Sequence, residues 1–181
     1  SISTDMNEMI RIRDFILNKP NVGVVFAGDE LEGLKAQYLS TNTAKTPIDV
    51  QIQIEFLKMM FFDPLAEQNK VLGMVSGYWG HPGWVNDATT LNIWRTMVGD
   101  LDIPIVQNGG FLDIKFPSGY IHSLQLWHNP PGNSKYDEVA GLREAILGTS
   151  ETVRPDGAIS GHIHRMGVAK ENYAGATSQV Y

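Results

Sequence analysis

Helix-like and strand-like hydrophobic patterns alternate along the first half of this chain. Asp5 and Glu8 form a capping-box-like start to a run whose apolar residues recur at helical spacing, which predicts a helix over residues 5–18. Residues 22–27 form an apolar run that is too short for a helix and ends in a Gly-Asp pair. This second pattern predicts a strand buried on both faces.

The same alternation then repeats. Thr46 and Pro47 are typical of a helix N-terminus and predict a second helix through about residue 68. Residues 70–76 predict a second buried strand, and residues 87–98 a third helix. Alternating helices and strands favour an α/β domain.

After about residue 103 the pattern changes to that of a hairpin. Residues 111–116 and 120–127 flank a Pro-Ser-Gly turn and predict two paired strands. A helix at about 135–147 and a short strand at 157–160 follow, and the tail is weakly patterned. Because neither a repeat nor a linker interrupts the sequence, we predict a single domain over residues 1–181.

Composition narrows the classes of function. The chain has 181 residues, 43% of them hydrophobic and 19% charged, so it can bury a substantial core. Its net charge of -6 argues against binding phosphate backbones by bulk positive charge. The sequence contains no cysteine, which excludes disulfides, thiolate metal sites and cysteine nucleophiles. Any metal must therefore bind to His, Asp, Glu or Asn.

The ends of the chain and its location can also be interpreted. No stretch approaches the ~18 consecutive apolar residues of a membrane helix, so we predict no membrane partner and a cytoplasmic location. Residue 1 is Ser, and residues 1–5 resemble the lead-in to a helix, so we expect the chain to start inside a longer one. Such an upstream part leaves room for a signal peptide.

A side chain able to bind metal follows each of four predicted strands. In chain order these are Asp29, His81, His128 and the pair His162 and His164. The carboxyl ends of strands in an α/β sheet share one edge, so we expect these distant residues to converge there. Imidazole and carboxylate together suit Zn, Mn or Fe, whereas calcium requires more oxygen ligands.

These segments resemble the motifs of the calcineurin-like metallophosphoesterases. That family carries, in order, D-x-H, G-D, G-N-H-(D/E), a single His and G-H-x-H. Gly28-Asp29 matches the second motif, His128 is similar to the fourth, and residues 161–164, Gly-His-Ile-His, match the fifth. The resemblance covers about residues 5–170 and implies a two-sheet β-sandwich flanked by helices, a four-layer αββα fold.

The resemblance also implies an activity, which is metal-dependent hydrolysis of a phosphate mono- or diester by a metal-activated hydroxide. Asp29 would bridge two divalent ions, with His128 and His162 on one and His164 on the other. Mn, Fe or Zn would fit these ligands, and the two ions would supply the positive field that the acidic chain lacks. The expected partner is a phosphate-ester substrate, a class that includes nucleotides and nucleic acids.

Two departures from the family pattern affect this interpretation. No D-x-H occurs in the sequence, and we expect that motif upstream of residue 1. The segment 77–84 replaces G-N-H and lacks its metal-binding Asn. In one alignment Tyr78 and Trp79 take the places of the Asn and His; we favour the other, which keeps His81 as the catalytic His that assists the leaving group. The second metal would then rely on water or Asn86, or the site would hold a single metal or be inert.

Each candidate also has a simpler interpretation. Asp29 after Gly is a common turn residue, and His128 or the His162 and His164 pair are also compatible with ordinary surface or strand-end positions. His81 is equally compatible with a structural role in a Gly-rich loop.

Three further residues near these motifs have plain interpretations. We take Trp127 as packing and His122 as non-functional. Glu30 either supports a metal ligand or is a solvated charge.

Two further functions stay open. A catalytically degenerate member of the family would keep the fold as a binding or assembly module. A mononuclear metal hydrolase built on Asp29, His128, His162 and His164 would contain one metal and lack phosphoesterase activity.

Overall fold

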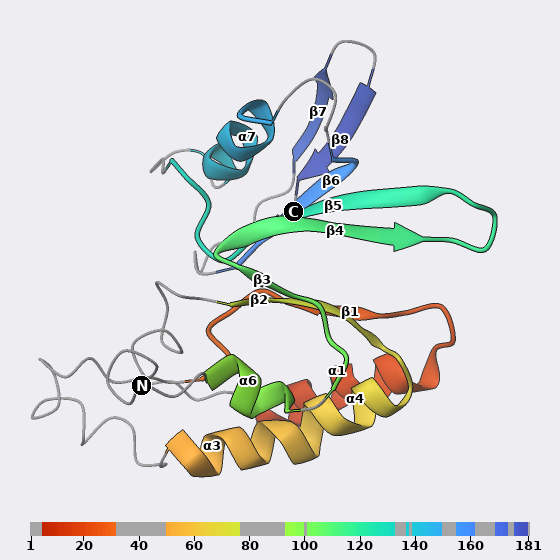
Figure 1. The fold of residues 1–181 in the computed structure, drawn as a ribbon, viewed down its shortest axis with the longest axis vertical. Helices are drawn as coiled ribbons and strands as arrows, with labels where there is room; N and C mark the ends of the chain where they lie inside the picture. The colour runs from red at the N-terminus through yellow and green to blue at the C-terminus, as the bar shows by residue number, and fades with distance from the viewer. Residues whose placement is uncertain are drawn as a thin grey trace, which may run out of the picture.

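The chain has a mixed α/β fold, shown in Figure 1. Two sheets are present within the described residues, one of three strands and one of five. None of the helices in this part of the chain is long and apolar enough to cross a membrane. The computed structural model describes residues 5–31, 50–76, 93–99, 101–132, 137, 139–149, 155–161, 169–173 and 176–180.

The smaller sheet is parallel and has the strand order β1-β2-β3. Its strands are β1 (Val24–Phe26), β2 (Val71–Ser76) and β3 (Ile105–Gln107). The two strands predicted at 22–27 and 70–76 are therefore confirmed, whereas β3 is too short to stand out in the sequence. The expectation that the first strand is buried on both faces is wrong. All three residues of β1 are half-buried, because β1 pairs only with β2 among the described strands.

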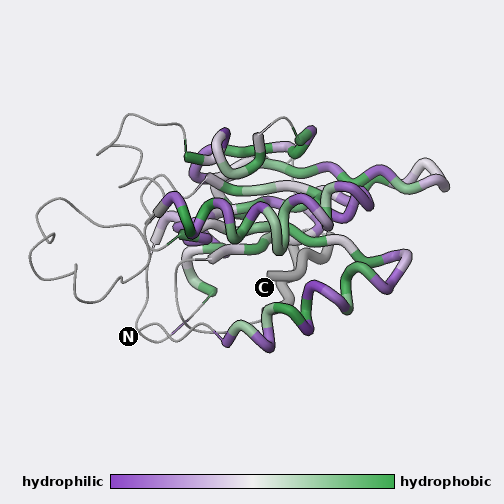
Figure 2. Tube along the Cα trace, turned by 90° about the horizontal axis from the view of Figure 1, so that it is seen from below, coloured by the Kyte–Doolittle hydropathy of each residue, from purple (hydrophilic) through white to green (hydrophobic). Residues whose placement is uncertain are grey.

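Four helices lie on one side of this sheet (Figure 1). They are α1 (Met6–Asn18), α3 (Val50–Leu57), α4 (Asp63–Glu67) and α6 (Ile93–Val98). The predicted cap of the first helix is confirmed, since the backbone N–H of Glu8 donates to the carboxylate of Asp5 at 3.1 Å. Figure 2 shows hydrophobic and hydrophilic residues alternating along the helices, as amphipathic packing requires.

The predicted second helix is only partly regular. A π-helical segment, Lys58–Phe62, connects α3 to α4 without a break in the chain of helical turns. The predicted starts of the second and third helices, at residues 46 and 87, lie outside the described residues. An extra residue per turn in the π segment is a local irregularity that hydrophobic spacing does not reveal.

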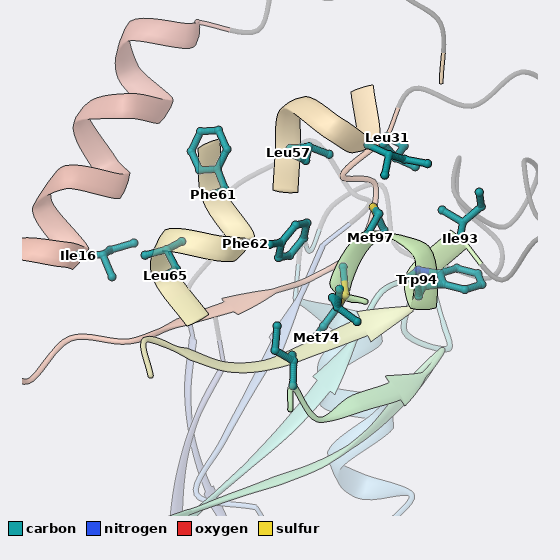
Figure 3. Packing of buried hydrophobic residues seen from close by; sticks show 13 residues of the cluster. Ile16, Leu31, Leu57, Phe61, Phe62, Leu65, Met74, Ile93, Trp94 and Met97 are labelled. Atoms are coloured by element: carbon teal, nitrogen blue, oxygen red, sulfur yellow. The ribbon is translucent and has the colours of Figure 1, made fainter. Parts of the chain in front are cut away.

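The main hydrophobic core lies between these helices and the three-stranded sheet. Phe62 and Met74 are fully buried there, and the ring of Phe62 lies 4.6 Å from that of Phe26 on β1. Figure 3 shows the side chains of the helices converging on β2. The buried members of this cluster are Ile16, Leu31, Ile54, Leu57, Phe61, Phe62, Leu65, Met74, Ile93, Trp94, Met97, Val98 and Ile103.

The larger sheet has the strand order β4-β5-β6-β8-β7. Its strands are β4 (Gly109–Lys115), β5 (Ile121–Trp127), β6 (Gly157–Ser160), β7 (Ala169–Tyr173) and β8 (Ala176–Val180). The predicted hairpin is confirmed as β4 and β5, and the predicted strand at 157–160 as β6. The hairpin of β7 and β8 was not predicted. β8 pairs in parallel with β6, and this long-range pairing leaves no mark in the local sequence.

The helix α7 (Ala140–Leu147) packs beside the larger sheet. Its residues Leu142 and Ile146 contact Ala158 of β6, with Trp127 against the same cluster. The predicted start of this helix, at 135, is wrong. Asp137 lies outside the helix, where its carboxylate accepts the N–H of Val139 at 3.1 Å and ends the turn before α7.

The two sheets pack against each other through a separate apolar cluster. Val75 of β2 contacts Leu124 and Leu126 of β5, and all three are buried. Half-buried residues from both sheets surround them: Val25, Val106, Leu112, Ile114 and Ile159. This contact fixes the carboxyl ends of strands from different sheets relative to one another.

Candidate functional site

The carboxyl ends of β1 and β5 meet at Asp29 and His128. The Nε2 atom of His128 lies 3.5 Å from Oδ1 of Asp29. The His128 side chain is 1% exposed and that of Asp29 is 22% exposed, so the pair reaches solvent only through the carboxylate. Two of the residues that the sequence predicted to converge are thus in contact, although 99 positions separate them (128 minus 29).

A glycine makes this contact possible. Gly28 has a φ of 92° and Asp29 a φ of 60°, so the chain leaves β1 through two successive left-handed residues. A Cβ atom on Gly28 would overlap the imidazole of His128. Gly28 therefore serves both the turn and the close approach of the ring.

The orientation of the His128 ring is set by a backbone carbonyl. Nδ1 lies 2.8 Å from the carbonyl oxygen of Ala27, which can only accept, so Nδ1 carries a proton and donates it. In a neutral ring the lone pair then lies on Nε2, the atom that faces Asp29. This arrangement of the second ring nitrogen is the one that metal-binding histidines adopt.

The separation of Nε2 and Oδ1 fits a shared cation. Two electron-rich atoms face each other at 3.5 Å, and a proton or a cation between them removes their repulsion. Two ligands bound to one ion at ~2.1 Å, with an angle between 90° and 109°, are about 3.0 to 3.4 Å apart. The observed distance is close to this range, so the pair is suitable as two ligands of one divalent ion.

The end of β6 joins the same edge. The N–H of Gly161 donates to the carbonyl of Trp127 at 3.2 Å, which ties β6 to the last residue of β5. A Cβ atom on Gly161 would lie 2.7 Å from the carbonyl oxygen of Ala27, so the backbone of β6 also touches that of β1. Gly161 immediately precedes His162 in the sequence.

The end of β2 reaches His128 through Asn108. The N–H of Asn108 donates to the carbonyl of Ser76 at 3.3 Å, and the N–H of His128 donates to the carbonyl of Asn108 at 3.1 Å. Asn108 has a φ of 58°, and its Oδ1 atom is buried without a hydrogen-bond partner in the described part of the chain. Asn108 is not among the predicted site residues, although Asn108-Gly109 between two strands is a typical signal for a left-handed turn.

Glu30 supports the turn that carries Asp29. Its Oε1 atom accepts the N–H of Gly28 at 2.8 Å, and within the described ranges its buried Oε2 atom has no hydrogen-bond partner. Burial raises the pKa of Glu30 to about 7, the backbone N–H groups of Glu30 and Gly28 oppose this rise, and the charge of Asp29 adds to it. Of the two interpretations of Glu30, a solvated charge is wrong.

The remaining predicted site residues lie outside the described residues. These are His81, His162 and His164, and with them Tyr78, Trp79 and Asn86. Among the residues that are described, no group of three or more His, Cys, Asp or Glu side chains could hold a metal ion. The predicted ligand set therefore stays a prediction, of which the structure brings two members, Asp29 and His128, together.

The side chains of Trp127 and His122, which were not predicted to belong to the site, have other contacts. Trp127 packs against the cluster of α7 and β6, on the opposite face of β5 from Leu126, which confirms its packing role. His122 lies in the hairpin, with its Nδ1 atom 3.7 Å from Asp156 and 3.4 Å from the hydroxyl of Tyr120.

Comparisons with protein-family models, with curated proteins and with solved structures found no match.

Proposed function

We propose that this protein is a metal-dependent phosphoesterase of the calcineurin-like metallophosphoesterase type. The observation that carries the proposal is the contact of Asp29 with His128, whose ring is oriented by the Ala27 carbonyl so that Nε2 faces the carboxylate. Carboxylate and imidazole at this separation suit a divalent ion of the Mn, Fe or Zn kind. Both residues stand at the positions of family motifs.

The arrangement of the elements supports the same proposal. Helices cover one face of the smaller sheet, the two sheets pack together, and α7 packs on the larger sheet (Figure 1). We interpret this succession as the four-layer αββα sandwich of the family. Four strand ends joined by backbone contacts at one edge are where such a fold binds ligands.

Each residue of the proposed site then has a role. Asp29 would bridge two ions, His128 and His162 would bind one of them, and His164 the other. His81 would protonate the leaving oxygen of the substrate. When bound, a pair of divalent ions polarises a phosphate and activates a water molecule.

The overall charge of the chain is consistent with a site in which bound metal ions, rather than basic side chains, attract the phosphate. A net charge of -6 gives no general attraction for a phosphate mono- or diester. Bound divalent ions would supply that attraction locally, at the edge where Asp29 and His128 meet. The chain itself orients the ligands, and Glu30 holds the turn after β1 through the N–H of Gly28.

The proposal is tested with metal-loaded full-length protein. Metal content is measured by mass spectrometry, and hydrolysis of 4-nitrophenyl phosphate and bis(4-nitrophenyl) phosphate is assayed with Mn²⁺. We expect turnover by the wild type and a loss of at least about 100-fold in Asp29→Asn and His128→Ala. His122→Ala is the matched control and should retain wild-type turnover.

Two results would contradict the proposal in different ways. Absence of turnover in the metal-loaded wild type removes the enzymatic function, and stoichiometric metal binding without turnover favours the degenerate binding module. Turnover that is unaffected by Asp29→Asn refutes the assignment of the site instead.

A further inference from the structure

Asn108 lies at a junction that joins the two sheets beside the proposed metal site. Its N–H donates to Ser76 at the end of β2, and its carbonyl accepts from His128 just after β5. It therefore connects one strand end of the smaller sheet to one of the larger sheet. Its φ of 58° is a left-handed conformation that Asn adopts more readily than most residues.

The register of the hairpin places Asn108 directly opposite His128. The ladder pairs Gly109 with Trp127 and Gly110 with Leu126, so the next pair is Asn108 with His128. The hydrogen bond from His128 to Asn108 closes this pair. Residues opposite each other in such a hydrogen-bonded pair have Cα atoms about 5.5 Å apart. Asn108 is thus an immediate neighbour of the proposed ligand His128.

The amide oxygen of Asn108 lies in an unusual environment for a polar atom. Oδ1 is buried, and no described residue donates a hydrogen bond to it. An isolated buried acceptor is energetically unfavourable, so native structures almost always satisfy it with a donor, a water molecule or a cation. An amide oxygen is also a good ligand for hard and borderline divalent ions.

We propose that Asn108 supplies an amide oxygen ligand to the divalent ion held by Asp29 and His128. The inference rests on the metal site of the proposed function and adds a ligand from the junction of β3 and β4. The backbone of Asn108 sets the position of this ligand, because hydrogen bonds to both sheets hold it in place. The ion then links residues from three chain segments: the turn after β1, this junction, and the end of β5.

The test measures Mn²⁺ binding to metal-stripped full-length protein by titration calorimetry. Asn108→Gly removes the amide and keeps the left-handed backbone without strain. We expect it to bind Mn²⁺ at least about tenfold more weakly than the wild type. Asn108→Asp keeps an oxygen ligand and should bind at least as tightly as the wild type.

Asn69 offers a matched control. It has a φ of 55° and precedes β2, at the opposite end of the strand from Ser76. Asn69→Gly should therefore leave Mn²⁺ affinity unchanged. Thermal unfolding of each metal-free variant shows whether the fold is retained, and Asn108→Gly should unfold within a few degrees of the wild type.

The outcomes separate this inference from the proposed function. If Asp29→Asn abolishes Mn²⁺ binding and Asn108→Gly binds like the wild type, Asn108 has only a conformational role and the inference fails. If the wild type does not bind Mn²⁺, or Asp29→Asn binds as well as the wild type, the metal site itself is wrong and both proposals fall.

Discussion

Two glycines allow three strand ends to touch. Gly28 lets the His128 ring approach the turn after β1, and Gly161 lets the backbone of β6 approach Ala27. Any side chain at either position would push these segments apart. The geometry of the candidate site thus depends on two residues without side chains as much as on its polar groups.

Gly28→Ala should damage the site and the fold together. The substitution adds a Cβ at a φ of 92° and overlaps the His128 ring, so we expect the free energy of unfolding to fall by about 3 kcal/mol. Gly119→Ala is the control, because Gly119 has a φ of 86° but nothing within 4 Å of an added Cβ. It should cost only about 1 kcal/mol in denaturant unfolding. Equal losses in the two variants would show that the contact with His128 is unimportant.

Glu30 should make the stability of the metal-stripped protein dependent on pH. Burial raises its pKa from 4.5 to about 7, so the folded state retains a proton that the unfolded chain has released. The stabilising contribution of protonated Glu30 is complete below about pH 4.5 and is lost as the pH rises through about 7. Relative to Glu30→Gln, wild-type stability should fall by up to about 3 kcal/mol over this range.

The comparison with Glu30→Gln isolates this effect. Asp29 and His128, which face the same turn, are present in both proteins, so the difference between the two stabilities reports Glu30. Glu67 is an exposed glutamate at the end of α4, and Glu67→Gln is the control. Its free energy of unfolding should depend on pH in the same way as that of the wild type. If the free energies of unfolding of the wild type and Glu30→Gln differ by the same amount at all pH values, the expectation is contradicted.

At the scale of elements, β4 is an open edge of the larger sheet. It pairs only with β5 among the described strands, and Figure 1 shows the end of this hairpin extending beyond the rest of its sheet. The N–H of Phe116 donates to the carbonyl of Tyr120 at 2.8 Å, so the alternation of the ladder leaves the backbone groups of Phe111, Asp113 and Lys115 facing outward. The two charged side chains are exposed and discourage pairing with another chain.

Removing these charges should promote association. The double variant Asp113→Val and Lys115→Val keeps the net charge and makes the outer edge of β4 apolar, so we expect concentration-dependent association in sedimentation velocity. The control is Glu8→Ala with Arg11→Ala, which removes an exposed ion pair from α1 without changing the net charge. A monomeric β4 variant at the concentrations where the wild type is monomeric would show that these charges do not protect the edge.

At the scale of the molecule, the contact between the sheets holds the site together. Leu126 is 1% exposed, packs against Val75 of the other sheet, and precedes His128 by two residues. Leu126→Ala should lower the free energy of unfolding by about 2–5 kcal/mol. Leu147, which is 59% exposed at the end of α7, provides a control whose change to Ala should cost less than about 0.5 kcal/mol. Chemical denaturation measures both, and similar small losses would contradict a tight inter-sheet core.

The local elements were largely predictable, because their signals are local. The Asp5 cap, the apolar run of β2 and the turn between β4 and β5 each result from neighbouring residues, and each prediction is confirmed. The short strand β3 and the parallel pairing of β8 with β6 were missed, since their partners are distant in sequence. The hairpin of β7 and β8 is local, and it was missed because the sequence of the tail is weakly patterned. The start of α7 was predicted at about residue 135 and lies at Ala140, because side-chain hydrogen bonding by Asp137 shapes the turn before the helix.

The candidate site was also predictable only in part. Residue type and strand context alone predicted that Asp29 and His128 follow strands whose ends converge, and they are in contact at 3.5 Å. Only the tertiary structure decided that Ala27 orients the imidazole, that Oε2 of Glu30 is buried, and that Asn108 joins the two sheets. Sequence patterns determine what each segment can form, because they act within a few residues. Which atoms meet depends on packing between segments, and no local pattern encodes it.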